Sequence, residues 1–161
     1  MNQSELLTTL RASRLGVELS DDQAALLAQH VSMRELAQGQ TLINEGESDD
    51  HLYYVVSGVL GAVKNAGRPE QATLHAATAG DLVGELSFID GAHHYASWIA
   101  LAPTRLVALE RRQFEQLLHS QPDLVYCIMR AIVRAVHEIQ RRLSMQAVEL
   151  SNYIFKQHGR Y

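Results

Sequence analysis

One segment of the 161-residue chain gathers the side chains that could bind a ligand or a proton. It reads Gly80-Asp-Leu-Val-Gly-Glu-Leu-Ser-Phe-Ile-Asp-Gly-Ala-His-His-Tyr-Ala-Ser-Trp98. Glu85 supplies a carboxylate, and His93 and His94 are adjacent imidazoles. A histidine near its ordinary pKa of about 6.5 takes up a proton readily beside an anion. Two solvated loop residues are the alternative interpretation of the histidine pair.

No pattern in the sequence indicates catalysis. The Gly-x-Ser-x-Gly elbow, the Walker phosphate loop and the metalloprotease helix are all absent. Eight histidines raise the question of a metal, above all His75 together with His93 and His94. Adjacent histidines lack the spacing of a defined ligand set, and there is no Cys-x-x-Cys partner. We therefore predict neither catalytic residues nor metal ligands.

Composition restricts the class of protein further. Hydrophobic residues make up 47% and charged residues 20% of the chain, which fits one globular domain over 1–161. A net charge of -4 gives no global attraction to nucleic acid or anionic lipid. The single cysteine, Cys127, and the absence of a signal peptide or an apolar span predict a cytoplasmic protein with no membrane association.

The elements expected around the segment are short strands flanked by helices. Ser20 is a predicted N-cap of a helix over 20–31, and residues 1–34 form an N-terminal helical segment. Five runs then have strand character: 41–43, 51–56, 59–63, 72–76 and 105–109. Glycines separate them, so the pattern over 35–110 predicts an antiparallel, jelly-roll-like β-roll rather than an alternating β/α sheet. The fold class is mainly β with flanking helices.

The order of these glycines carries a family resemblance. The chain contains Leu36-x-x-Gly39-x-x-Leu42-x-x-Glu45-Gly46-Glu47-x-x-Asp50-x-Leu52-Tyr53-x-Val55-x-x-Gly58, followed by Gly80-Asp81-x-x-Gly84-Glu85-Leu86. This set resembles the cyclic-nucleotide-binding domain family, in its catabolite-activator branch. The resemblance implies that residues 80–98 form a phosphate-binding cassette. In that family the cassette helix presents backbone N–H groups to the cyclic phosphate, a glutamate binds the ribose hydroxyl, and an arginine neutralises the phosphate.

Only some residues of this chain match the binding residues of the family. Gly84, Glu85 and Leu86 match, with Glu85 at the ribose-binding position. Tyr95 stands at the arginine position and Ala96 at that of the following small hydroxyl residue, while Ser97 continues into a strand. On the helix after Pro122, the positions of base-contacting hydroxyls fall on Ile139 and Gln140. The implied ligand-binding set is Gly84, Glu85, Leu86, His93, His94, Tyr95, Ala96, Ser97, Ile139 and Gln140.

The missing arginine predicts weak binding of a cyclic nucleotide. A buried phosphate without its cationic partner loses on the order of 3–5 kcal/mol, which weakens binding by roughly a hundredfold to several thousandfold. We expect a cAMP dissociation constant no better than tens of micromolar. Two alternatives concern single residues. Glu85 could merely stabilise a helix start, and Tyr95 could fill the pocket with its hydroxyl bonded to Glu85.

Helices complete the chain over 111–161. Residues 113–118 form a short one, and Pro122 marks the first turn of a long one. An apolar stripe along this helix is formed by Leu124, Ile128, Ile132, Ala135, Ile139, Leu143, Gln146 and Leu150. Packing on the β-roll is one explanation. Because so long a helix overhangs a small roll, we expect a parallel homodimer through it, as the resemblance also implies.

Function follows from these expectations. About ten residues after Leu150 are too few for a helix-turn-helix, so no DNA binding is expected from this chain. We predict a regulatory or sensor module of the cyclic-nucleotide-binding type, whose ligand need not be a cyclic nucleotide, and which holds no other cofactor. The alternatives are a weak cAMP or cGMP binder, a ligand-free module that docks a protein partner, and a haem or metal sensor, since some sensors related to this fold carry haem.

Overall fold

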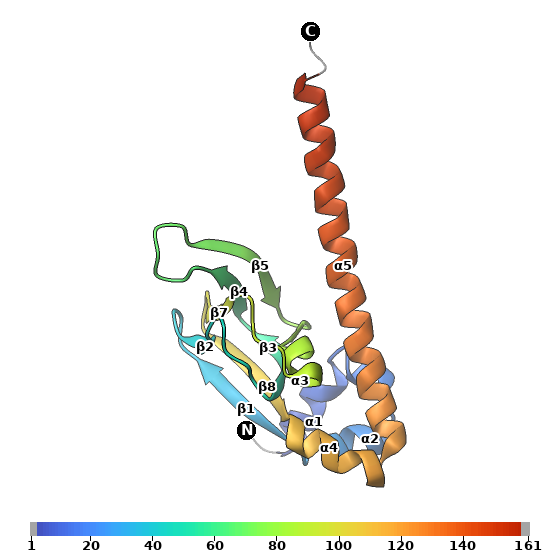
Figure 1. Cartoon of the computed structure of the whole chain (residues 1–161). Coiled ribbons are helices and arrows are strands. Elements are labelled where there is room, and N and C mark those ends of the chain that lie inside the picture. The colour runs from blue at the N-terminus through green and yellow to red at the C-terminus, as the bar shows by residue number, and fades with distance from the viewer. Residues whose placement is uncertain (1–2, 159–161) are drawn as a thin grey trace.

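Two antiparallel sheets form the centre of the molecule, as seen in the computed structural model, which describes residues 3–158 and the side chains of residues 4–154. One sheet has the strand order β1-β8-β3-β6 and the other β2-β7-β4-β5. Helices lie at the N-terminal end and at the C-terminal end of the chain (Figure 1). The strands are β1 (Val31–Leu36), β2 (Thr41–Ile43), β3 (His51–Ser57), β4 (Val59–Lys64), β5 (Ala72–Thr78), β6 (Leu82–Val83), β7 (Ser97–Ala100) and β8 (Thr104–Glu110). The predicted β-roll with flanking helices is confirmed.

Strand β3 shows how the sequence builds two cores at once. Its side chains alternate between the two faces of the sheet, so residues two apart share a face. Tyr53 and Val55 belong to the core between the sheets. Leu52 and Tyr54 belong to the core between the outer face of this sheet and the helices. Four consecutive residues are therefore buried, which makes β3 the wall shared by both cores.

The N-terminal helices are α1 (Gln3–Arg11), the 3-10 turn η1 (Gly16–Glu18) and α2 (Asp21–Leu27). Ser20 caps α2 as predicted, and a capping box forms because Ser20 and Gln23 each accept the other's backbone N–H. The predicted end of this helix at residue 31 is wrong. Val31 instead begins β1 and pairs with Leu109 of β8, so pairing between distant strands outweighs the local helical spacing.

Helices α4 (Arg111–Ser120) and α5 (Pro122–His158) complete the chain. The start of α5 at Pro122 is as predicted. Leu124, Ile128 and Ile132 are buried in the helical core, whereas every described side chain of α5 from residue 140 onward is exposed. Figure 1 shows this second half of α5 extending beyond the β-roll. The predicted stripe thus divides into a packed first half and an overhanging second half.

Candidate functional site

The site is built around the six-residue helix α3 (Glu85–Asp90). Gly84 precedes it with φ 87° and Gly91 follows it with φ 72°, and such left-handed backbone favours glycine. A Cβ on Gly84 would also lie 2.8 Å from the backbone oxygen of His51. These two glycines therefore set the start and the end of α3 and allow the helix to lie close to β3.

A cavity of about 200 Å³ lies between α3, the loop that follows it, the sheet of β5 and β7, and α5. It is lined by His75, Leu82, Gly84, Glu85, Leu86, Ser87, Asp90, Ala92, His93, His94, Tyr95, Trp98, Val136 and Ile139. Seven of the ten residues carried over from the family resemblance are among them. The other three are Ala96 and Ser97, which are buried, and Gln140, which is exposed on α5.

These three residues lie outside the cavity wall for different physical reasons. The Ser97 hydroxyl accepts the backbone N–H of Glu45 at 2.9 Å, so it fastens the β2–β3 loop. Ala96 belongs to the core between the sheets. Gln140 directly follows Ile139 on a helix, and a neighbouring position on a helix faces a different direction.

Sequence reasoning missed half of the cavity wall. Trp98, Leu82 and Val136 come from β7, β6 and α5, and they meet only because the chain folds back on itself. His75 was considered only as a metal ligand, and it contacts Trp98 edge-on with ring centroids 5.1 Å apart. The alternation of strand β7 was the one signal that could have placed Trp98 on the inner face.

Tyr95 leaves the cavity open. Its side chain lies at the rim and is 59% exposed. Partial burial of the hydroxyl and the nearby charge of Glu85 raise the pKa of Tyr95. No hydrogen bond joins these two side chains within the described part of the chain, so the arrangement in which Tyr95 closes the pocket onto Glu85 is not formed.

Glu85 is a buried carboxyl group with no cationic partner among the described residues. The residue is 7% exposed. Burial raises its pKa, the charge of Asp81 adds to this effect, and a hydrogen bond from its own backbone N–H opposes it. Desolvation disfavours the charged form, so ionised Glu85 is held at a free-energy cost in the unliganded protein. Costly charged groups of this kind mark candidate binding sites.

Two histidines of the cavity, His75 and His94, are pushed towards their neutral forms. The Nε2 atom of His94 is buried and has no hydrogen-bond partner in the described part of the chain. Burial lowers the pKa of His94, against the opposing charge of Asp49. Burial and the charge of Arg142 lower the pKa of His75. A neutral imidazole is a hydrogen-bonding group rather than a cation.

The cations nearest to the cassette are occupied by other partners. Lys64 pairs with Glu45 and donates to the backbone oxygen of Tyr95 at 2.8 Å. Arg111 donates through Nε to the oxygen of Phe88 at 2.8 Å and pairs with Asp50 at 2.9 Å. No lysine or arginine lines the cavity within residues 4–154.

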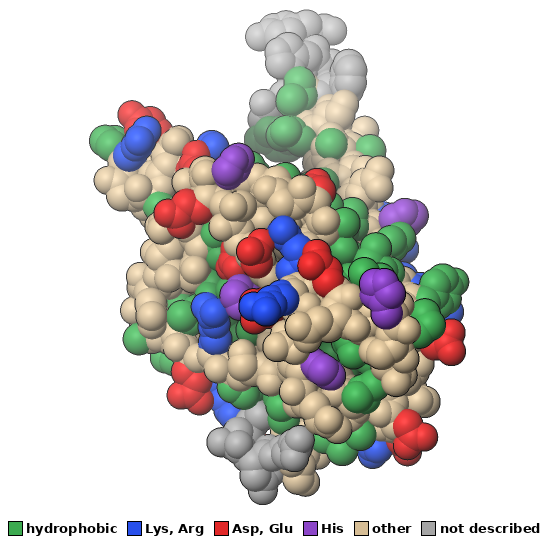
Figure 2. Space-filling model, turned by 60° about the horizontal axis from the view of Figure 1, so that its bottom comes forward, with side chains coloured by type: hydrophobic (Ala, Val, Ile, Leu, Met, Phe, Trp, Pro, Cys, Tyr) green, Lys and Arg blue, Asp and Glu red, His purple; other side chains and the backbone are tan. Residues whose placement is uncertain are grey.

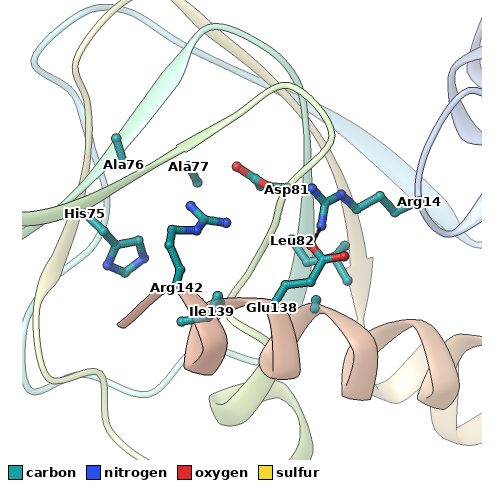
Figure 3. A pocket seen from close by; sticks show the side chains of 10 residues that line it. Arg14, His75, Ala76, Ala77, Asp81, Leu82, Glu138, Ile139 and Arg142 are labelled. Atoms are coloured by element: carbon teal, nitrogen blue, oxygen red, sulfur yellow. Dashed lines mark hydrogen bonds and ion pairs between the residues drawn. The ribbon is translucent and has the colours of Figure 1, made fainter. Parts of the chain in front are cut away.

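A second, smaller hollow adjoins the cavity where α5 crosses β5 (Figure 3). Arg14, from the segment after α1, pairs there with Glu138 of α5 and lies 3.6 Å from Asp81. Arg142 points into the same hollow beside His75. The hollow therefore contains two acidic residues, Asp81 and Glu138, and two basic residues, Arg14 and Arg142. Arg14 connects the N-terminal segment to α5 and to the turn before β6.

A hydrogen-bonded group fastens the other side of α3. The Ser87 hydroxyl accepts the backbone N–H of Asp49 and donates to its oxygen, each at 3.1 Å. Asp49 also accepts from the Tyr53 hydroxyl at 2.6 Å, and His51 Nδ1 lies 2.8 Å from its carboxylate. Burial acts to raise the pKa of Asp49, but these hydrogen bonds outweigh it and lower the pKa. Helix α3 thus has a fixed support on β3.

Three further features of the molecule bear on function. Within the described residues, no group of three or more His, Cys, Asp or Glu side chains is placed to hold a metal ion, although His75, His93 and His94 share one cavity. No helix among these residues is both long and apolar enough to span a bilayer. On the face drawn in Figure 2, acidic and basic side chains are interspersed, and lysines and arginines form no extended patch.

Comparison with known proteins now identifies the family. The family described as "Cyclic nucleotide-binding domain" matches residues 33–121. The chain belongs to this family.

Similar proteins include regulators and one much longer enzyme. The cAMP-activated global transcriptional regulator CRP of Salmonella typhimurium is 23% identical over 88% of this chain. The chain spans 64% of that relative, which is less than two thirds of its length. Neuropathy target esterase sws of Drosophila virilis is 26% identical over 98% of this chain, which covers only 11% of the esterase.

Solved structures share the fold. A cyclic nucleotide-binding domain from Methylobacillus flagellatus has a TM-score of 0.79 at 23% identity, covering 91% of this chain and 83% of that one. The regulatory subunit of a cAMP-independent protein kinase A from Trypanosoma brucei has a TM-score of 0.68 at 22% identity, covering 88% of this chain and 51% of that one. A triple variant of that subunit, with one threonine replaced by arginine, was solved with cAMP bound.

Proposed function

We propose that this chain is a non-enzymatic regulatory module whose small-molecule ligand binds between α3 and α5, and that it binds cyclic nucleotides weakly at most. One observation carries the proposal. The cavity keeps the buried carboxyl of Glu85, but no described lysine or arginine lines it, and Tyr95 stands at its rim. A cyclic phosphate would therefore be desolvated without a counter-charge. With one cysteine in the chain, we place the module in the cytoplasm.

Two contacts would transmit ligand binding to α5. Arg111 begins α4, which leads into α5, and it holds the C-terminal end of α3. Arg14 holds Asp81, three residues before Gly84, and also Glu138 of α5. A ligand that moves α3 relative to α5 would alter both contacts. These contacts would let the conformation of α5 depend on whether a ligand is bound, as a regulatory module requires.

The cAMP-independent kinase subunit of Trypanosoma brucei supports the first test. Its cAMP-bound variant carries an introduced arginine, which suggests the matching change here. Calorimetric titration of the unaltered chain with cAMP and cGMP should give dissociation constants of tens of micromolar or weaker. Tyr95→Arg should strengthen cAMP binding at least tenfold, because it restores a cation beside the phosphate.

The control is Leu118→Arg, which places an arginine at an exposed position of α4 outside the cavity. It should leave cAMP affinity unchanged. A dissociation constant below about 1 μM for the unaltered chain would contradict the proposal. Failure of every ligand, including cAMP with the Tyr95→Arg variant, would favour the alternative of a ligand-free module that docks a protein partner.

We also propose that the module forms a parallel homodimer through α5, on a face that shares Leu143 and Leu150 with the predicted stripe but differs from it over the first half of the helix. Ile128, Ile132 and Ala135 are buried against the chain's own β-roll. The adjacent face repeats at alternating steps of three and four, the spacing of a two-stranded coiled coil. It is formed by Tyr126, Met129, Val133, Val136, Gln140, Leu143, Ala147 and Leu150. Tyr126, Val133, Leu143 and Leu150 are each more than half exposed.

A further inference from the structure

We propose that the cavity between α3 and α5 takes an uncharged ligand with a planar heteroaromatic ring and adjacent hydroxyl groups, the chemistry of a nucleoside without its phosphate. This inference rests on the proposed function, because it names the class of ligand for the same cavity. It draws on three features of the cavity: its charges, its buried hydrogen-bonding atoms and its apolar walls.

The charges that line the cavity disfavour an anion. An anionic group would meet the carboxylates of Glu85 and Asp90 in a cavity with no described lysine or arginine in its wall. Three cations behind the wall have acidic partners: Lys64 pairs with Glu45, Arg111 with Asp50, and Arg14 with Glu138. Drawing any of these three to a ligand would break an existing ion pair. A fourth, Arg142, lies beside His75 in the adjoining hollow and does not line the cavity. An uncharged ligand avoids both costs.

The buried polar atoms call for hydroxyl and ring hydrogen bonds. Glu85 is 7% exposed, and its carboxylate has room for more hydrogen bonds than the one from its own backbone N–H. Two adjacent hydroxyls can donate to the two oxygens of one carboxylate. His94 Nε2 is buried, lacks a partner among the described residues and belongs to the same cavity. It can bond a ring nitrogen or an exocyclic amine.

The remaining wall suits a flat ring. Trp98 and His75 lie edge to face, and Leu86, Val136 and Ile139 add apolar surface. A cavity of about 150 Å³ holds one benzene ring. The cavity here is about 200 Å³, so its interior admits the ring, and the sugar would lie beside Glu85 and extend to the open rim at Tyr95. Burying the ring against aromatic and aliphatic side chains supplies the apolar part of the affinity.

The experiment is isothermal titration calorimetry of the whole chain at pH 7.5. The probes are adenosine, guanosine, 2′-deoxyadenosine, 2′-deoxyguanosine, cAMP and cGMP. At least one ribonucleoside should bind tenfold or more tightly than its cyclic monophosphate, and tenfold or more tightly than its 2′-deoxy counterpart. Glu85→Gln should weaken ribonucleoside binding tenfold or more, whereas Glu70→Gln, on the exposed β4–β5 turn, should not change it.

Every other outcome contradicts the inference, and one of them also contradicts the proposed function. Binding of the cyclic monophosphate as tightly as the ribonucleoside overturns the inference, as does equal binding of the 2′-deoxy probe. Absence of ribonucleoside binding, with cAMP bound by Tyr95→Arg, overturns the inference and leaves the proposed function intact. Absence of binding in both titrations overturns the two together. Circular dichroism of Glu85→Gln and Glu70→Gln confirms that both variants are folded before they are titrated.

Discussion

Glu85 is the residue at which stability and binding oppose each other. It is buried at the start of α3, and burial raises its pKa above the ordinary value of 4.5. A group with a raised pKa contributes stability that is fully present below the unfolded-state pKa. That contribution is lost as the pH rises through the folded-state pKa. At neutral pH the ionised carboxylate therefore destabilises the unliganded fold.

Glu85→Gln should stabilise the unliganded protein at neutral pH. We expect a melting temperature about 2–4 °C higher at pH 7.5, the shift that about 1 kcal/mol produces in a domain of this length. The difference should shrink towards pH 4, where the carboxyl is protonated in both states. Differential scanning fluorimetry over this pH range measures it, with Glu70→Gln as the control. A variant that is less stable than the parent at pH 7.5 would show that the carboxylate has a partner that supports the fold.

The pH dependence of binding separates two chemistries at the same site. A hydroxyl ligand favours ionised Glu85, so its bound-state pKa lies below the free one. Ribonucleoside affinity is then full above the free pKa and declines as the pH falls through it. The titratable neighbours are Asp81, Asp90, His75, His93, His94 and Tyr95, and α5 adds only apolar Val136 and Ile139 to the cavity.

For a ribonucleoside we expect tighter binding at pH 7.5 than at pH 5. An anion bound beside His93 and His94 would show the reverse, tighter at pH 6 than at pH 8. That dependence would flatten in the double variant His93→Ala with His94→Ala. Calorimetry at several pH values distinguishes the two. If the affinity does not change with pH, neither Glu85 nor the histidines change their protonation when the ligand binds.

At the scale of elements, the junction of α3 with α4 governs the cassette. Arg111 donates to the backbone oxygens of Phe88 and Ser87, which lie in the last turns of α3. A cation at the C-terminal end of a helix satisfies unpaired carbonyls and interacts favourably with the helix dipole. Arg111 also pairs with Asp50 in the loop before β3. One side chain therefore connects three elements around the cassette.

Arg111→Ala should destabilise the protein by about 1–3 kcal/mol, because it leaves two carbonyl groups without a charged donor. Urea denaturation measures the loss. The control is Arg112→Ala, which removes an exposed arginine one residue along α4 and should change stability by less than about 0.5 kcal/mol. Amide exchange in α3 should speed up in the first variant only. If the two substitutions have equal effects, Arg111 does not cap the C-terminal end of α3.

At the scale of the whole molecule, the overhanging half of α5 sets the expected assembly. Leu143→Glu with Leu150→Glu should give a folded monomer in light scattering, because both side chains lie on the proposed coiled-coil face. Met145→Glu with Val148→Glu introduces the same charges at residues that are 59% exposed on the other side of the helix. This control should remain dimeric. A monomeric parent protein, or a dimeric Leu143 and Leu150 variant, would contradict the interface.

The choice of residues for this test depends on tertiary structure. The stripe predicted from the sequence includes Ile132 and Ile139 as interface residues. Ile132 is 3% exposed in the chain's own core, so glutamate there would unfold the protein rather than separate two subunits. Both stripes have helical spacing, and only the position of the β-roll shows which one is already covered.

Local rules in the sequence determined much of this protein. Ser20 marked the start of α2 and Pro122 the start of α5, since each acts through its own backbone conformation or hydrogen bond. The order of glycines and acidic residues between Leu36 and Leu86 was sufficient to predict the family. Replacement of the expected arginine by Tyr95 could likewise be read directly, because it concerns the identity of one residue.

Tertiary structure alone decided what depends on residues far apart in the chain. β1 exists because Val31–Leu36 pairs with β8, whose partner residues lie 68 to 78 positions later in the chain. The cavity is open because Trp98, His75 and Val136 form walls that leave Tyr95 at the rim. The cost of ionising Glu85 arises from burial, which no sequence spacing records. Short-range spacing fixes backbone turns, whereas burial and charge balance are sums over neighbours that only folding brings together.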